Sequence, residues 1–151
     1  MRIEHDFTVA APPDAVFAHL AEPANYVGLS PLVVNVRDVS RDDGVTRYRA
    51  VERFPVFRKL SYHNVIAVTL VADGDDLTVS GDVVSPGRVR MAYRFEITLD
   101  GDGATVTDTL LLRAPPGLRR FAASRAREVQ LARARILAER LAALACYLTC
   151  C

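Results

Sequence analysis

The chain contains 151 residues, half of them hydrophobic, and carries a formal net charge of +1. A chain of this length can bury a sizeable core, and we expect residues 1–151 to form a single domain. No stretch approaches the ~20 consecutive apolar residues of a membrane-spanning helix, and residues 1–6 lack the apolar core of a signal peptide. The sequence therefore favours a cytoplasmic protein.

Residues 1–31 predict one strand followed by two short helices. Residues 2–9 alternate between apolar and polar side chains, as a half-buried strand does. Residues 11–14, Ala-Pro-Pro-Asp, are typical of a helix start, because the first turn tolerates proline and the helix dipole favours an early carboxylate. Pro23 ends this helix, residues 24–29 can form a second one, and Pro31 prevents its continuation.

Residues 32–113 predict a run of strands joined by short turns. Strands that follow one another on short turns favour an antiparallel meander. Apolar and polar side chains alternate most clearly in residues 89–99, which indicates a strand with one solvent-exposed face and a sheet covered on one side only. The expected strands are 32–40, 45–54, 59–71, 77–84, 89–99 and 104–113.

Residues 118–148 predict one long helix. They contain no proline or glycine and many Ala, Arg and Leu residues, all good helix formers. At ~100° per residue the apolar side chains form a broad stripe, which we expect to cover the sheet. The stripe consists of Leu118, Phe121, Ala122, Val129, Ala132, Ile136 and Ala143, widened by Leu137, Leu141, Leu144 and Leu148.

This order of elements resembles the START-like, or helix-grip, superfamily, which includes polyketide cyclases and aromatases, lipid-transfer domains, coenzyme Q-binding proteins and pollen-allergen-type carriers. The resemblance covers nearly the whole chain. It is carried locally by residues 3–26, I-E-H-D-F-T-V-A-A-P-P-D-A-V-F-A-H-L-A-E-P-A-N-Y, and residues 30–36, S-P-L-V-V-N-V. Many members have tryptophan near the start of the second strand, where this chain has Gly-Leu-Ser-Pro at 28–31.

The resemblance implies an α+β helix-grip fold with an internal cavity. The expected sheet is curved, antiparallel and seven-stranded, with two short helices after strand one and a long C-terminal helix packed across it. In such folds an apolar cavity between sheet and helix holds a hydrophobic small molecule.

Residues 54–57, Phe-Pro-Val-Phe, form the only apolar tip among the expected turns. Exposing apolar groups to water costs ~0.8 kcal/mol per CH₂, so we expect this tip to be covered. It serves either as a lid over the cavity mouth or as a plug folded onto the short helices or into a dimer contact, and the sequence favours neither. A transient membrane contact ranks behind both.

Several polar residues lie on otherwise apolar faces and are the site candidates. His5, Asp108 and Arg125 are the candidates for acid-base catalysis, although each alone is more often structural. A buried Arg125 would need a partner, and Asp108 and Glu52 are the two carboxylates considered for it. The expected ligand-binding residues are Tyr48, Glu52, Phe54, Phe57, Tyr62, Asn64, Met91, Tyr93, Phe95, Phe121 and Arg125.

Positive charge is concentrated toward the C-terminus. Residues 113–140 contain eight arginines and two glutamates, a net +6 that leaves −5 for the rest of the chain. Lys59 is the only lysine among 19 basic residues, so a general preference for arginine explains much of this pattern. We interpret the basic helix as a solvated face and expect no nucleic-acid partner.

Familiar catalytic and metal-binding motifs are missing from the sequence. It contains no G-x-S-x-G, phosphate loop, H-E-x-x-H or C-x-x-C. Cys146, Cys150 and Cys151 lack a nearby histidine and are expected to be reduced apolar fillers rather than zinc ligands. We expect no metal and no cofactor.

Two functions lead from the sequence, ahead of a third and weakly motivated one, an interaction module that works through the basic helix. The first is binding or carriage of a hydrophobic small molecule, such as a lipid, isoprenoid or polyketide-like compound. The second is an enzyme of the cyclase, aromatase or dehydrase type that uses acid-base groups in the same cavity.

Overall fold

The computed structural model describes residues 1–149, without the side chains of Val56, Phe57 and Thr149. The first strand, β1 (Arg2–Val9), is followed by helix α1 (Pro13–Ala21) and the short 3₁₀ helix η1 (Pro23–Tyr26). The prolines at the start of both helices fit the first turn, where no intrahelical partner for an N–H is required. The second helix is shorter than residues 24–29 predicted, because the chain turns at Val27 and Gly28 to begin the sheet.

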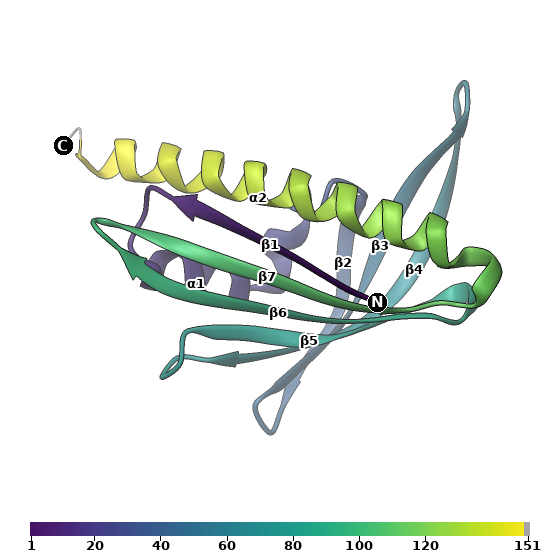
Figure 1. The fold of residues 1–151 in the computed structure, drawn as a ribbon, viewed down its shortest axis with the longest axis horizontal. Coiled ribbons are helices and arrows are strands. Elements are labelled where there is room, and N and C mark those ends of the chain that lie inside the picture. The colour runs from purple at the N-terminus through teal and green to yellow at the C-terminus, as the bar shows by residue number, and fades with distance from the viewer. Residues whose placement is uncertain (150–151) are drawn as a thin grey trace.

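The seven strands form one antiparallel sheet in the order β1-β7-β6-β5-β4-β3-β2 (Figure 1). The first strand pairs with the last, and every other strand pairs with its neighbour in sequence. The predicted meander and helix-grip fold are therefore confirmed. The remaining strands are β2 (Val33–Asp42), β3 (Val45–Phe57), β4 (Leu60–Asp73), β5 (Thr78–Ser85), β6 (Val89–Asp100) and β7 (Gly103–Arg113), with the 3₁₀ turn η2 (Pro86–Arg88) between β5 and β6.

Helix α2 (Arg119–Thr149) follows the 3₁₀ turn η3 (Pro116–Leu118) and runs along the sheet (Figure 1). It contacts β1 and β7, whereas α1 contacts β5, β6 and β7. The core between these layers contains fully buried Phe95, Leu110 and Leu137. The middle of the predicted apolar stripe covers this core, with Leu137 and Leu141 buried, whereas its two ends are exposed at Leu118, Phe121, Leu144 and Leu148.

The expected apolar turn at residues 54–57 is wrong in one respect. These residues continue strand β3, with Phe54 opposite Tyr62, and the chain reverses at Arg58 and Lys59. Pro55 is tolerated because β2 no longer flanks β3 there, so no neighbouring strand requires an N–H donor on that side. The β3–β4 hairpin consequently projects beyond the rest of the sheet (Figure 1).

Candidate functional site

A cavity of about 420 Å³ lies between the sheet and the first half of α2. This volume falls within the ~300–1,000 Å³ of small-molecule sites. Its walls come mainly from apolar side chains of β3, β4, β5, β6, β7 and α2. The lining residues are Leu32, Glu52, Phe54, Tyr62, Asn64, Ile66, Val83, Ser85, Pro86, Gly87, Val89, Met91, Leu110, Leu112, Leu118, Phe121, Ala122, Arg125, Ala126, Val129 and Arg133.

A second hollow of about 90 Å³ adjoins the first at its inner end. The two share several walls, including Glu52, Met91 and Arg133. Tyr26, Tyr48 and Tyr93 also line the inner hollow, whose walls are about as apolar as those of the outer cavity. Hydrogen-bonding side chains therefore line both parts of the site, Asn64 and Ser85 in the outer part and the tyrosines in the inner part.

An ion pair between Arg133 of α2 and Asp108 of β7 forms the charged centre of this inner end. Arg133 Nη2 donates to Asp108 Oδ2 at 2.6 Å, and both side chains are buried. Burial alone would lower the pKa of the Arg133 guanidinium, but the charge of Asp108 and its hydrogen bond outweigh that effect and raise the pKa. The guanidinium also lies 4.9 Å from the centre of the Phe95 ring. Arg133 is thus a permanent cation in the cavity wall.

Two buried atoms of this ion pair have no hydrogen-bond partner among the described residues. They are Asp108 Oδ1 and Arg133 Nε. A guanidinium offers five N–H donors, and the bond to Asp108 uses only one of them. The arginine therefore has spare donor capacity in a wall that a ligand can reach.

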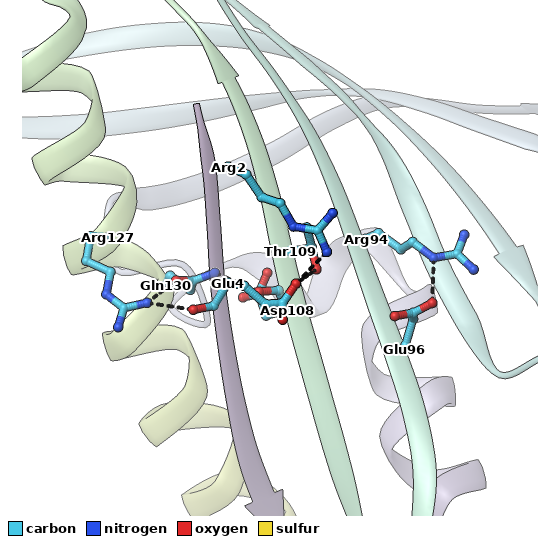
Figure 2. Close-up of polar contacts among 8 residues, drawn as sticks. All are labelled: Arg2, Glu4, Arg94, Glu96, Asp108, Thr109, Arg127 and Gln130. Carbon is cyan, nitrogen blue, oxygen red and sulfur yellow. Dashed lines mark hydrogen bonds and ion pairs between the residues drawn. The ribbon is translucent and has the colours of Figure 1, made fainter.

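Gln130 and Arg127, about one and two turns before Arg133, attach α2 to the sheet (Figure 2). Gln130 is fully buried and donates to the Asp108 carbonyl at 2.8 Å. Arg127 donates to Gln130 Oε1 at 2.8 Å and to the Glu4 carbonyl at 3.1 Å (Figure 2). These bonds fix the position of α2 along the sheet so that Arg133 lies opposite Asp108.

The three tyrosines of the inner hollow are protonated donors at neutral pH. Burial raises the pKa of Tyr26, Tyr48 and Tyr93 above the ordinary value of 10.0. Tyr26 donates to the Leu20 carbonyl and Tyr93 to the Thr69 carbonyl, each at 2.8 Å. Tyr48 lines the hollow beside them and is available for a ligand acceptor.

Glu52 of β3 is the carboxyl that lines both hollows. Burial raises its pKa above 4.5, although the hydrogen bond from Asn64 partly opposes this effect. Asn64 Nδ2 lies 3.3 Å from Glu52 Oε2 and 3.1 Å from Ser85 Oγ. A half-buried carboxyl with a raised pKa is suited to proton transfer.

Most of the predicted ligand-binding residues line these hollows. The outer cavity includes Glu52, Phe54, Tyr62, Asn64, Met91, Phe121 and Arg125, and the inner hollow includes Tyr48 and Tyr93. Phe95 lies in the core beneath Arg133 rather than in the lining. The side chain of Phe57, together with Cys150 and Cys151, lies outside the described residues.

The three catalytic candidates do not form one cluster. His5 is opposite Asp108 in the sheet, but it stacks on Phe7, with ring centres 5.8 Å apart, and lines neither hollow. Arg125 does not pair with Asp108 or Glu52, because it lies at the cavity mouth and binds Glu128 at 3.1 Å. Asp108 pairs with Arg133 instead.

Sequence reasoning missed Arg133, Gln130 and Tyr26. The available signal for Arg133 was its spacing: it stands four residues after Val129 and four before Leu137, on the apolar stripe. Gln130 and Tyr26 gave no comparable signal.

Within residues 1–149 no group of three or more His, Cys, Asp or Glu side chains is placed to hold a metal ion. No helix in the same range is long and apolar enough to cross a membrane.

Solved structures share this architecture at low sequence identity. The Zhui aromatase/cyclase from Streptomyces sp. R1128 superposes with a TM-score of 0.74 at 18% identity over 93% of each chain. A START superfamily protein from Mycobacterium smegmatis gives 0.73 at 16% identity over 95% of this chain and 98% of its own. A major latex-like protein from Panax ginseng gives 0.64 at 12% identity over 93% of this chain and 97% of its own.

No curated protein matches the sequence. The model of one protein family, described as polyketide cyclase/dehydrase and lipid transport, matches residues 1–149. The chain therefore belongs to the polyketide cyclase/dehydrase and lipid transport family.

Proposed function

We propose that this protein binds a hydrophobic small molecule in the cavity between the sheet and α2. The observation that carries the proposal is the arrangement of that cavity, whose walls are mainly apolar and whose inner end carries Arg133. Membership of a family that includes lipid-transport proteins supports it. Suitable ligands are lipids, isoprenoids and polyketide-like compounds.

The proposed ligand carries one hydrogen-bond acceptor, such as a carbonyl or carboxylate, at its inner end. Arg133 supplies spare N–H donors there, and Tyr48 supplies a protonated hydroxyl. Convergent polar groups at one end of an apolar cavity orient a ligand more than they increase its affinity. The apolar remainder of the ligand would then extend along Ile66, Val83 and Val129 toward the mouth.

The test combines native mass spectrometry of the freshly purified protein with solvent extraction of bound compounds and uptake of a panel of fatty acids, isoprenoids and aromatic polyketides. The substitution Ala126→Trp should fill the outer cavity and abolish uptake, because Ala126 lines it. Ser124→Trp is the matched control, since Ser124 is exposed on the same helix and does not line the cavity. Equal uptake by the two variants, or no uptake by the unaltered protein, would contradict the proposal.

A second candidate function is a cyclase or dehydrase reaction in the same cavity. The observation that favours it is the raised pKa of Glu52 in a wall shared with Arg133. The Glu52 carboxylate would remove an α-proton from a bound ketone, and the Arg133 cation would stabilise the resulting enolate. An enzyme is supported if a compound incubated with the unaltered protein is recovered chemically changed, while the same compound incubated with Glu52→Gln is recovered unchanged. Release of the same compound by both proteins would favour carriage.

A further inference from the structure

The turns at the two ends of the sheet differ in charge. In an antiparallel meander alternate turns lie at opposite ends of the strands. The β2–β3, β4–β5 and β6–β7 turns share one end (residues 42–45, 73–78 and 100–103), and they contain no lysine or arginine. Their acidic residues are Asp42, Asp43, Asp73, Asp75, Asp76, Asp100 and Asp102.

The opposite end, around the cavity mouth, is basic. It comprises the β3–β4 hairpin tip, the β5–β6 connection and the start of α2, which lie at the right of Figure 1. Residues 53–62, 85–90 and 113–125 contain no aspartate or glutamate. The carboxylates that flank these segments within three residues are Glu52, which lines the cavity, exposed Asp82, and Glu128, which pairs with Arg125. The exposed basic residues of this end are Arg53, Arg58, Lys59, Arg88, Arg90, Arg113, Arg119, Arg120 and Arg125.

Large apolar side chains are exposed among these charges. Leu60 is 70% exposed, Phe121 60% and Tyr62 57%. Tyr62 and Phe121 line the cavity despite this exposure, so they mark its opening, and Leu60 lies two residues from Tyr62 on the same strand face. An exposed apolar patch bordered by polar residues is typical of an interaction surface.

We propose that this basic and apolar rim docks on an anionic lipid bilayer, with the cavity mouth facing the membrane. Basic side chains near an anionic bilayer contribute about 1 kcal/mol each, and apolar side chains between them can enter the headgroup region. The acidic turns at the opposite end are repelled by the same surface, so the charge distribution fixes the orientation. Aliphatic Leu60 and Leu118 suit a lipid surface, whereas the aromatic Tyr62 and Phe121, which could stack on bases, line the cavity opening.

Docking would connect the cavity directly with the apolar interior of the bilayer. A hydrophobic ligand could then enter past Tyr62 and Phe121 without crossing water. Only this transfer step rests on the proposed function, since docking requires the rim alone.

The experiment measures cosedimentation of the full chain with vesicles of phosphatidylcholine alone or mixed with phosphatidylglycerol. We expect binding only to the anionic vesicles and a loss of binding as salt increases. The double variant Arg119→Glu/Arg120→Glu should lose at least about tenfold in affinity. Arg37→Glu/Arg41→Glu is the control with the same change in net charge, on strand β2.

A second pair of variants separates lipid insertion from charge attraction. Leu60→Ser removes a side chain that is 70% exposed at the rim, and Leu99→Ser removes one that is 72% exposed near the acidic end. We expect only Leu60→Ser to weaken vesicle binding, by several-fold. Equal binding by these two variants would overturn the proposal, and so would RNA binding without vesicle binding.

The two proposals fail separately. Ligand uptake from solution without vesicle binding would overturn the docking surface and leave the proposed function standing. Vesicle binding without uptake of any hydrophobic compound would support docking and contradict the proposed function.

Discussion

Two arginines on the same helix, Arg125 and Arg133, occupy opposite ends of one cavity. Arg125 and its partner Glu128 have side chains that are 46% and 61% exposed, whereas those of Arg133 and Asp108 are 8% and 1% exposed. Eight residues of helix correspond to about 12 Å, which is enough to move from the wet mouth to the buried centre. The same residue type is therefore a surface group at one position and a structural cation at the other.

The difference between them comes from their partners. Glu128 stands on α2 itself, one turn after Arg125, so that ion pair can form without the sheet. Asp108 belongs to β7, so the Arg133 pair exists only when helix and sheet are packed together. The inner pair should consequently govern stability, and the outer one should contribute little.

The largest expected effect comes from Asp108→Ala. This substitution leaves the Arg133 guanidinium buried without its counter-ion, which typically costs about 3–5 kcal/mol of unfolding free energy. Glu128→Ala removes the equivalent partner of Arg125 and should cost less than about 1 kcal/mol, because water and salt screen exposed pairs. Urea unfolding measures both values, and similar losses for the two variants would contradict the comparison.

The double variant Asp108→Ala/Arg133→Met tests the cause of that loss. If an uncompensated charge destabilises Asp108→Ala, replacing Arg133 as well should recover part of the lost stability. If both positions matter only through packing, the double variant should be less stable than either single one.

The next largest effect is expected from Gly81→Ala, next to Tyr93, which lines the inner hollow. A Cβ at Gly81 would lie 1.8 Å from the Thr69 carbonyl oxygen and 2.8 Å from the Tyr93 hydroxyl. The absence of a side chain there lets Tyr93 reach across β5 to bond Thr69. Since the conflict is with backbone, we expect a loss of about 3 kcal/mol or more.

Gly87→Ala at the mouth is the matched control for Gly81→Ala. Gly87 has φ of +79°, and the nearest atom to a Cβ there would be 3.8 Å away on Leu118. Only backbone strain is then incurred, about 1–2 kcal/mol. Thermal unfolding of both variants should show the inner wall to be less tolerant than the mouth, and the reverse order would be evidence against a tightly packed inner end.

The fold could be predicted largely from the sequence because its signals are local. Alternation over residues 89–99 marked β6, and the stretch of residues without proline or glycine after Gly117 marked α2. The apolar residues 54–57 were misplaced as a turn because a strand can continue past its neighbour. Only the pairing with β4 shows that β3 extends to Phe57.

The site was less predictable because the burial of a residue on α2 depends on how the helix packs against the sheet, which local sequence does not determine. Helical periodicity places Arg125 and Arg133 near the same apolar stripe but does not say which one meets a carboxylate from β7. Asp108 was recognised as a polar residue on an apolar face, yet its partner depends on how α2 lies on the sheet. The cavity-lining residues of the strands were easier to predict, because alternation alone assigns Tyr48, Glu52 and Asn64 to the inner face of the sheet.

A smaller effect is expected from the pH dependence of Glu52, which lines the same cavity as the two arginines. Its pKa is raised in the folded state, so the folded protein binds more protons than the unfolded chain above pH 4.5. The stability from protonated Glu52 is thus complete below that pH and is lost as pH rises through the folded pKa. Glu52→Gln should flatten this decline, as measured by urea unfolding between pH 4 and about 8, and an unchanged pH profile would contradict a buried carboxyl.

The smallest effect concerns another arginine of α2, Arg140, none of whose partners is oppositely charged. It donates to the carbonyls of Asn25 and Val27 at 2.7 and 2.9 Å, and its Nη1 lies 3.3 Å from His19 Nε2. Burial and then the Arg140 charge lower the pKa of His19 below 6.5, the opposite direction to Glu52.

The stability that neutral His19 provides is therefore present above pH 6.5 and is lost as pH falls through its folded pKa. His19→Gln should reduce the acid-side loss of stability without changing the decline toward higher pH that Glu52 causes. NMR titration of the His19 ring in the unaltered protein measures the same shift directly. A pKa at or above 6.5 would mean that neither the burial of His19 nor the neighbouring charge of Arg140 disfavours the protonated ring, and the contrast with Glu52 would then be lost.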